Sequence, residues 1–504
     1  MKICRMGMLV KVKAKSMNGM QLRFLKLIGA LFFLFTVICS YQNANHFTHM
    51  NIGIILACIG GLGLIWLAAH LAAWQISNRV FVAILLCMAV GTRLAWVLTV
   101  DTPPVSDFLF MHTAALGVTK GDFIFRDSEY FVTWAYQIGF TLYQALLIKL
   151  FGTPLIVLKL YNIAFSVGTA WLLYLIAVQV FNEFCGRITL FFYVFYTPNI
   201  ILCSVLTNQH IATFLFVLGS YFVVHKGLAT TYNWILMGLC YGIANLFRPL
   251  GSFYIGCFAV YFILFELFAI QKKWRVQRLT KMLGMMVVYL IVQQLVNIAF
   301  VNTSFIQTSL TNKEPYWKFV VGLNPSTVGT WSIEDDHYVD PYPIGPERNQ
   351  VELEMIKMRL TDKSQLVALF IKKFGVLWGA ADSSVNWTLG EADRPILAAI
   401  LIVTECLAYI LMAFLGMIAV LALFRKKEYP KSSFFLLLLV GYAGLHLIIE
   451  IQTRYRFDIM PCIFILQSYG VYVLYSKRQK KKRPTTSGAT EEVSLKNSEK
   501  RSYC

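Results

Sequence analysis

A group of ionisable side chains directly follows an apolar run in the first quarter of the chain. Residues 101–123 read DTPPVSDFLFMHTAALGVTKGDF and hold three aspartates, a histidine and a lysine. Pro103 and Pro104 restrict the backbone and help to end a preceding helix. Asp107 lies a few residues beyond the run, where a hydrated carboxylate can act as a general base on a hydroxyl. Alternatively, Asp107 caps a short helix that begins at SDF.

Two arginines lie in a second polar stretch between apolar runs. The segment IIEIQTRYRFDIMP, residues 448–461, carries Arg454 and Arg456 after Glu450. The planar fork of an arginine matches two oxygens of a phosphate, so both arginines are candidates for binding a phosphate group. Alternatively, they pair with Glu450 or Asp458 inside the same stretch.

Two further arginines lie in apolar surroundings. Arg248 precedes Pro249 in NLFRPLG, and Arg93 lies in GTRLAWVL, roughly two turns inside its run. Charges at such depth usually face a cavity or a partner, although a long side chain can also extend toward water. We treat both as candidate phosphate ligands. The other possible site residues are His112, Lys120, Glu450 and Asp335.

The composition predicts an all-α integral membrane protein. The 504 residues are 58% hydrophobic and 14% charged, whereas about a quarter of a typical soluble domain is charged. Successive apolar runs of about 20 residues are each long enough to cross a bilayer. We expect about twelve transmembrane helices, at residues 24–40, 52–74, 80–100, 154–180, 188–204, 209–225, 233–248, 252–270, 283–301, 395–424, 433–450 and 459–476.

The distribution of lysine and arginine predicts how these helices are oriented. With the N-terminus inside the cell, most short inner loops are basic, as positive-inside loops should be. The net charge of +19 then belongs to cytoplasmic segments and anionic lipid, and we expect no nucleic-acid partner. Both termini should lie in the cytoplasm of a multi-pass protein of the plasma membrane.

Two outer segments are too long to be simple connections. The stretches 130–152 and 350–377 within them are amphipathic, which is typical of helices lying in the membrane interface. The expected division is a basic cytoplasmic start at 1–23, three spans within 24–100, an outer loop carrying Asp107 at 101–153, six spans within 154–301, a large outer loop at 302–394, three spans within 395–476 and a basic disordered tail at 477–504.

The eleven cysteines give no sign of a disulfide framework or of zinc-ligand spacing. Most of them lie in apolar runs, where a cysteine usually packs as a small apolar side chain. We expect no cofactor, and the sequence leaves dependence on a divalent metal open.

The order of these stretches resembles the GT-C superfamily of polytopic glycosyltransferases. More closely, it resembles the bacterial family-39 enzymes, which are related to protein O-mannosyltransferases and to the aminoarabinose transferases of lipid A. The resemblance spans residues 93 to about 475. The stretches that carry it are PVSDFLFMHTAALGVTKGDF, YQIGFTLYQALLIKLFG, GIANLFRPLG, GLNPSTVGTWSIEDD and EIQTRYRFDIMP.

The resemblance implies a polyprenyl-phosphate sugar donor whose sugar is presented outside the membrane. It also implies that an aspartate of the first outer loop is the catalytic base, and Asp107 matches that position. Many eukaryotic relatives have a paired Asp-Glu there, whereas this chain has Asp107 followed by Phe108. The acceptor hydroxyl could belong to a glycan, a glycolipid or a protein.

Three other functions fit parts of the same pattern. A twelve-helix secondary transporter would place its polar groups near the bilayer midplane on broken helices, whereas the charges here gather at one edge. A polysaccharide polymerase or ligase would also use lipid-linked sugars and outer-loop residues. A nonenzymatic assembly partner is the third alternative. Transfer of sugar by the purified protein would separate the enzymes from the transporter.

Overall fold

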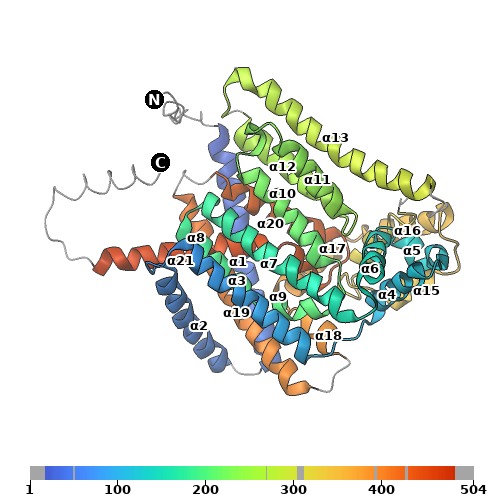
Figure 1. Ribbon diagram of the computed structural model, residues 1–504, viewed down its shortest axis with the longest axis horizontal. Helices are drawn as coiled ribbons and strands as arrows, with labels where there is room; N and C mark the ends of the chain where they lie inside the picture. Colours follow the sequence, from blue (N-terminus) through green and yellow to red (C-terminus); the bar gives the residue numbers. More distant parts are fainter. Residues whose placement is uncertain are drawn as a thin grey trace.

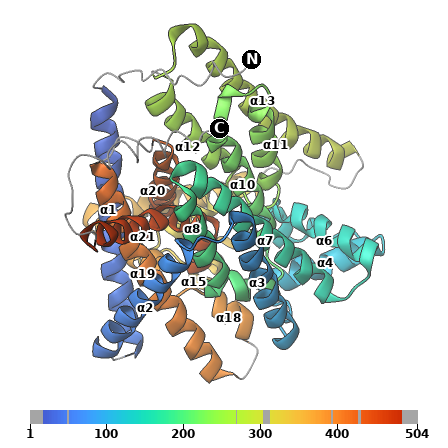
Figure 2. The same cartoon turned by 60° about the vertical axis from the view of Figure 1, so that its left-hand side comes forward.

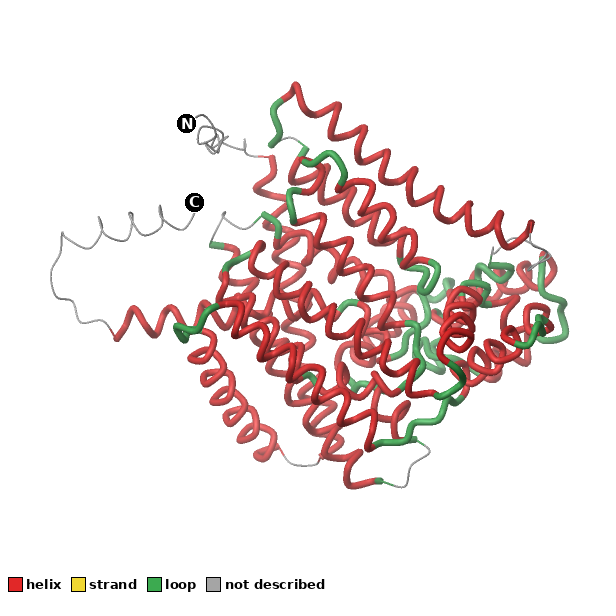
Figure 3. Tube along the Cα trace, in the orientation of Figure 1, coloured by secondary structure: helices red, strands yellow, loops and turns green. Residues whose placement is uncertain are grey.

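The computed structural model describes residues 17–48, 51–267, 269–302, 312–390, 394–425 and 430–482, and the regular structure in these ranges is helical (Figure 3). The expected all-α class is thereby confirmed for the described part of the chain. The expected basic start and disordered tail lie mostly outside these ranges.

Five helices are long and apolar enough to cross a membrane, which makes the chain a multi-pass membrane protein. They are α1 (Met17–Thr48), α3 (Asn78–Thr99), α7 (Leu155–Val180), α13 (Lys272–Asn302) and α19 (Pro395–Phe424). A sixth span forms if α8 (Glu183–Phe195) is joined to α9 (Thr197–Ile201) and η2 (Leu202–Ser204), across a bend of 63°. Pro198 lies in the first turn of the second part, where a missing backbone N–H and a bulky ring favour a break.

Helices also occupy the other six expected spans. They are α2 (Asn51–Ala72), α10 (Gln209–Val224), α11 (Asn233–Asn245), α12 (Gly251–Tyr261), α20 (Ser432–Ile448) and α21 (Met460–Lys482). Of these, α10, α11, α12 and α20 are 11 to 17 residues long, which is shorter than the about 20 residues that usually cross a bilayer. In α21, the basic residues from Lys477 onward lower the hydropathy, together with Gln467 and Ser468, which are fully buried.

The two outer segments form short helices. The first contains α4 (Ser106–Thr119), η1 (Ile124–Asp127), α5 (Glu129–Thr133) and α6 (Gln137–Phe151). The second contains α14 (Trp317–Gly322), α15 (Ile333–Val339), α16 (Pro346–Arg359), α17 (Lys363–Gly379) and α18 (Ser384–Leu389). Each amphipathic stretch expected to form one helix therefore forms two. Figure 1 shows α4, α5, α6, α15 and α16 gathered at one end of the molecule.

The centre of the protein is built around α21. This helix packs against α8, α19 and α20, and α1 packs against α19 (Figure 2). Phe464 and Tyr469 of α21 are fully buried. In contrast, α13 runs along the edge of the molecule (Figure 1), and only Met282 and Met285 among its described side chains are buried. Its exposed apolar surface fits contact with lipid.

Shorter elements connect these helices. They are η3 (Gly227–Ala229), the π-helical turn η4 (Phe262–Glu266) and the 3₁₀-helix η5 (Thr453–Asp458). The last of these lies between α20 and α21, and it brings a charged segment to the end where the outer helices meet.

Candidate functional site

Asp107 lies in the first turn of α4. The preceding Val105 makes no side-chain cap, and Ser106 has a φ of 50°, a conformation that non-glycine residues rarely adopt. Such a backbone costs on the order of 1–3 kcal/mol, and it persists only where its surroundings hold it. Among the residues that the structure describes, the partner of the Asp107 carboxylate is Arg454 and not a backbone N–H. This arrangement disfavours the helix-cap alternative.

Arg454 projects from η5 toward Asp107. Its Nη2 lies 3.7 Å from Asp107 Oδ2, and its Nε donates a 2.7 Å hydrogen bond to Gln452 Oε1. The guanidinium carbon lies 4.6 Å from the ring centre of Trp387 and 5.3 Å from that of Phe108. These aromatic contacts stabilise the cation and fix its position beside the carboxylate.

Three cations surround the ring of Tyr455. Arg248, Lys318 and Arg454 lie 5.4, 5.7 and 5.9 Å from its centre. They belong to the turn after α11, to α14 and to η5, so they meet only when the chain is folded. We call these three cations, with their carboxylate partners Asp107, Glu450 and Asp458, the Tyr455 cluster.

Each cation of the Tyr455 cluster faces one of these carboxylates. The distance is 2.7 Å from Arg248 to Asp458, 3.4 Å from Lys318 to Glu450 and 3.7 Å from Arg454 to Asp107. Glu450 and Asp458 therefore pair with residues from outside the 448–461 stretch. The Arg454 pair is the longest of the three, and the Asp107 side chain in it remains 38% exposed.

The pair formed by Lys318 and Glu450 is held in its charged form. Burial acts to raise the pKa of Glu450, but the Lys318 ammonium and a 2.8 Å hydrogen bond from Gln452 Nε2 bring that pKa below its usual value. Burial acts to lower the pKa of Lys318, whereas Tyr455 and Glu450 raise it above the usual value. The backbone N–H of Glu450 also donates to the Lys318 carbonyl at 2.9 Å.

The pKa of the Asp107 carboxyl is raised above its usual value, whereas that of Glu450 is lowered. Burial among neighbouring groups raises the pKa of Asp107, and the negative charge of Glu450 acts in the same direction. Arg454 and Lys318 lower the pKa without cancelling these effects. A carboxylate with a raised pKa that is still reached by solvent is suited to accept a proton from a hydroxyl.

Sequence reasoning missed two lysines that shape this region. Lys318 lies in EPYWKFVVG, where nothing local distinguishes it from the other basic residues of the large outer loop. Lys373 of α17 donates hydrogen bonds of 2.6–2.9 Å to the carbonyls of Gly322, Leu447 and Ile449. Glu450 directly follows Ile449, so these hydrogen bonds fix the backbone where the charged segment begins.

Arg456 lies apart from the solvent, although it is two residues from Arg454. Its side chain is 0% exposed, and its Nη2 lies 3.6 Å from both Asp382 and Glu405. The guanidinium carbon lies 4.5 Å from the ring centre of Tyr409. Two carboxylates already neutralise this cation, so the geometry assigns Arg456 a structural position and not one facing a lipid phosphate.

Arg93 is also enclosed by protein. It is fully buried, its Nε donates to Ser166 Oγ at 2.8 Å, and its Nη atoms donate to the carbonyls of Ala89, Tyr193 and Val194. Tyr193 and Val194 lie at the end of α8, just before the bend into α9. Arg93 thus satisfies carbonyls freed by that break, and it contacts no member of the Tyr455 cluster.

The remaining candidates from the sequence make local contacts outside the Tyr455 cluster. His112 Nδ1 lies 3.2 Å from Gln144 Oε1, which joins α4 to α6. Asp335 accepts hydrogen bonds from Arg359 and Asn324 at 2.6 and 2.8 Å. Lys120 is exposed at the end of α4.

A cavity of about 450 Å³ opens beside the cluster. Trp387 lines it and also stacks with Arg454, so the two features adjoin. The cavity is also lined by Asp101, Thr102 and Asn386. An aromatic ring next to several hydrogen-bonding side chains matches the mixed polar and apolar surface of a sugar.

Within the described ranges, no three or more histidine, cysteine, aspartate or glutamate side chains come together as a metal-binding group. The other two carboxylates of the Tyr455 cluster, Glu450 and Asp458, are each paired with a cation. No residue of the Tyr455 cluster is therefore assigned to a metal.

No protein-family model and no curated protein matches the chain. Among solved structures, it is similar to the archaeal oligosaccharyltransferase AglB from Archaeoglobus fulgidus, in complex with an inhibitory peptide and a dolichol-phosphate. The identity is 11%, the TM-score is 0.40, and the match covers 82% of this chain and 53% of AglB. The chain thus spans about half the length of AglB.

A second similar structure is ArnT from Cupriavidus metallidurans bound to undecaprenyl phosphate. Its identity to the chain is 12% and the TM-score is 0.31, with 78% of this chain and 77% of ArnT covered. At these identities and TM-scores, neither likeness says anything about activity.

Proposed function

We propose that the protein is a membrane glycosyltransferase of the GT-C type. It transfers a sugar from a polyprenyl-phosphate donor to an acceptor hydroxyl at the outer face of the membrane, with Asp107 as general base. The observation that carries this proposal is the Asp107–Arg454 pair, in which a partly exposed carboxylate of raised pKa lies 3.7 Å from a cation of the Tyr455 cluster. The sequence resemblance to GT-C enzymes supports the same function.

The chemistry requires one proton transfer and one exchange of bonds. The acceptor oxygen forms a bond to the anomeric carbon of the sugar while its proton moves to a carboxylate oxygen of Asp107. The bond from the anomeric carbon to the phosphate oxygen breaks, and the polyprenyl phosphate leaves with that electron pair. Preorganised cations at the leaving oxygen stabilise the charge that develops there.

The pairing of charges in the cluster links the proton transfer to the departure of the phosphate. When Asp107 accepts the proton, its negative charge disappears and Arg454 loses its carboxylate partner. At the same moment, the leaving phosphate gains negative charge. Arg454 and Lys318 are therefore the proposed phosphate ligands, and Arg248, held at 2.7 Å by Asp458, is a weaker helper.

The cavity lined by Trp387, Asp101 and Asn386 is the proposed place for the sugar or the acceptor. It adjoins the cluster on the side of Arg454, so a bound hydroxyl can approach Asp107 without entering the bilayer. The lipid part of the donor cannot leave the bilayer, and the acceptor cannot enter it. The membrane edge is where both can meet.

The proposed orientation follows from the charge distribution. Both termini lie in the cytoplasm of a plasma-membrane protein, and the outer helices α4–α6 and α14–α18 lie outside. Single cysteines replacing the exposed residues Ser128 and Glu334 in a cysteine-free background should react with an impermeant reagent on intact cells, whereas one replacing the exposed Gln277 should be protected. The opposite pattern would invert the orientation.

Transfer by purified protein is the central test. The protein in liposomes is given polyprenyl-phosphate hexoses and pentoses together with candidate glycan, glycolipid and peptide acceptors. We expect release of polyprenyl phosphate with one of them, and release at least about a hundredfold slower by Asp107→Asn protein. Movement of sugar across the liposome without bond cleavage would indicate a transporter. Growth of a sugar chain from a lipid carrier would indicate a polymerase or ligase. A deletion strain should lack one surface sugar, which would identify the product.

A further inference from the structure

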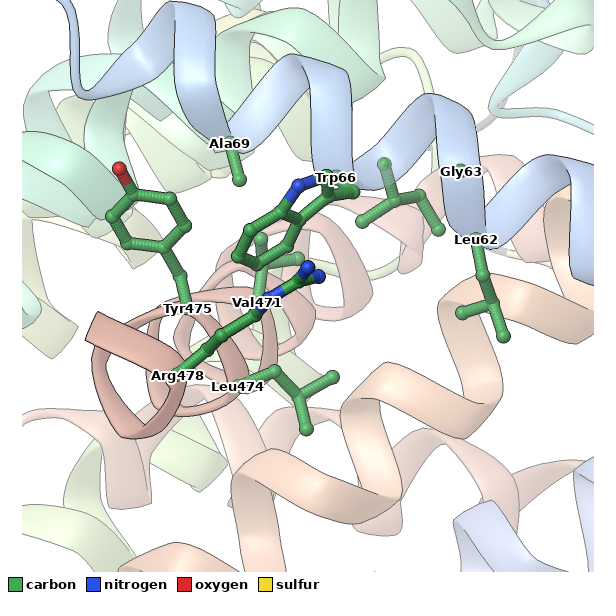
Figure 4. Close-up of a pocket in the computed structure, with 9 residues that line it drawn as sticks. Leu62, Gly63, Trp66, Ala69, Val471, Leu474, Tyr475 and Arg478 are labelled. Atoms are coloured by element: carbon green, nitrogen blue, oxygen red, sulfur yellow. The ribbon is translucent and has the colours of Figure 1, made fainter. Parts of the chain in front are cut away.

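A crevice lies between α2 and α21, away from the Tyr455 cluster. Its volume is about 360 Å³, within the range of roughly 300–1,000 Å³ that is usual for small-molecule sites. Its walls are largely aliphatic and aromatic. Figure 4 shows Leu62 and Trp66 of α2 facing Val471, Leu474, Tyr475 and Arg478 of α21 across this space.

The crevice has one charged end. The Arg478 guanidinium carbon lies 4.2 Å from the ring centre of Trp66, and Figure 4 shows both groups at the crevice. Arg478 forms no hydrogen bond or ion pair with any residue that the structure describes. The Tyr475 hydroxyl receives a 3.0 Å hydrogen bond from Gln479 and can still donate its own proton. A cation held by stacking alone keeps all its N–H groups available for an anion.

The outer surface beside the crevice is apolar. Leu62, Leu64 and Leu67 of α2 are 38%, 68% and 55% exposed, and Leu474 of α21 is 39% exposed. Such a surface faces lipid in a membrane protein. The segment KRQKKKR begins at residue 477, so positive charge follows directly after the apolar part of α21. The crevice is therefore apolar along its length and cationic where the helix leaves the membrane.

We propose that this crevice binds an anionic phospholipid of the cytoplasmic leaflet. One acyl chain lies between α2 and α21, and the phosphate accepts hydrogen bonds from Arg478. Only the assignment to the cytoplasmic leaflet rests on the proposed orientation; the rest does not depend on the proposed enzyme activity. Charge complementarity selects the occupant, because a neutral chain would leave the Arg478 guanidinium without a partner.

Two pairs of variants distinguish this site from diffuse attraction to charged lipid. Arg478→Gln removes the cation of the crevice, and Lys477→Gln removes an exposed neighbouring cation that does not line it. Gly63→Leu fills the crevice, since a Cβ at Gly63 meets no atom within 4 Å. Gly60→Leu adds the same bulk at an equally open position of α2 outside the crevice.

Binding is measured by native mass spectrometry of the full-length protein in detergent, titrated with phosphatidylglycerol or phosphatidylcholine. We expect the protein to prefer phosphatidylglycerol by about fivefold, which corresponds to about 1 kcal/mol for one basic residue at a membrane surface. Arg478→Gln should abolish that preference, and Gly63→Leu should weaken the binding of both lipids. Lys477→Gln and Gly60→Leu should bind as the unaltered protein does.

Equal loss in Arg478→Gln and Lys477→Gln would overturn the proposal in favour of diffuse attraction. Equal binding of the two lipids by the unaltered protein would also overturn it. The acidic tail residues Glu491 and Glu492, which lie outside the described ranges, are a competing occupant. If the preference for phosphatidylglycerol appears only after both are changed to glutamine, the tail occupies the crevice of the unaltered protein. That result would overturn the proposal.

Discussion

Arg454 and Arg456 lie two residues apart on η5, and their surroundings are opposite. Arg456 is fully buried between Asp382 and Glu405, each 3.6 Å away. Among the described residues, Arg454 has one carboxylate partner within 4 Å, and that partner, Asp107, lies 3.7 Å away and is partly exposed. A buried cation must be neutralised during folding, because an unpaired charge in a dry interior is very costly. The Arg454 side chain is only 9% exposed, but solvent reaches its partner Asp107, so Arg454 can exchange that partner for a ligand.

Arginine thus has two different roles on η5, one structural and one in the candidate site. Arg456 connects η5 to α19 and to the segment before α18, and its two carboxylates leave no charge for a phosphate. Arg454 belongs to a cluster whose carboxylate Asp107 can be neutralised by a proton. Removing each group in turn should therefore produce different kinds of defect, in stability for the first and in reaction rate for the second.

The largest effect is expected from Arg456→Ala. The substitution leaves Asp382 and Glu405 buried without their cation, and breaking such an arrangement typically costs about 3–5 kcal/mol. The protein should lose much of its folded yield and melt at a lower temperature, as measured by thermal unfolding in detergent. Arg454→Ala should melt much closer to the unaltered protein. A stable Arg456→Ala protein with weakened donor binding would move Arg456 into the functional site.

Asp107→Asn should cause the largest loss of rate in a folded protein. The substitution keeps the size of the side chain but removes the basic oxygen, and general-base catalysis is worth about 10²–10⁴-fold. We expect sugar transfer to slow by at least about a hundredfold. Asp122→Asn is the matched control, because that carboxylate accepts the backbone N–H of Ile124 in a turn. Near-normal turnover by Asp107→Asn protein would remove Asp107 from the mechanism.

Arg454→Lys tests whether the shape of the cation matters as well as its charge. Lysine loses the planar fork and the stacking on Trp387 and Phe108. Hydrogen bonds to charged groups are worth about 1.5–3 kcal/mol, so we expect donor binding to weaken by at least about tenfold. Lys120→Gln, at an exposed cation of the same outer segment, should leave donor binding unchanged. If Arg454→Lys protein binds the donor with unaltered affinity, a positive charge without the planar fork is sufficient for donor binding.

The smallest effect is expected in the dependence of rate on pH. The base must be ionised, so activity should fall as pH falls through the pKa of Asp107, which burial raises above the usual aspartate value. Lys318 lowers that pKa and Glu450 raises it. Lys318→Gln should therefore move the acidic limb of kcat/KM to higher pH, and Glu450→Gln should move it to lower pH. If neither substitution moves the acidic limb, that limb reports the ionisation of a group other than Asp107.

Much of the helical architecture could be predicted from the sequence. Long apolar runs such as 154–180 and 395–424 predict helices, because every backbone group in a bilayer must be hydrogen-bonded within the segment. The structure has α7 and α19 there. The bend between α8 and α9 also has a local cause in Pro198. The limits of the short outer helices were less predictable, since short amphipathic segments take their ends from packing.

The sequence by itself determined that Asp107, Arg454 and Arg456 follow apolar runs, because hydropathy and proline position are local properties. It did not determine their partners. Glu450 pairs with Lys318, 132 residues away, and not with its near neighbours Arg454 and Arg456. Only the tertiary structure decided that Arg456 has two buried carboxylate partners, whereas the partner of Arg454 is partly exposed. Ion pairing depends on distance and solvent exposure in space, and these are set by how α14, α18 and α19 pack around η5.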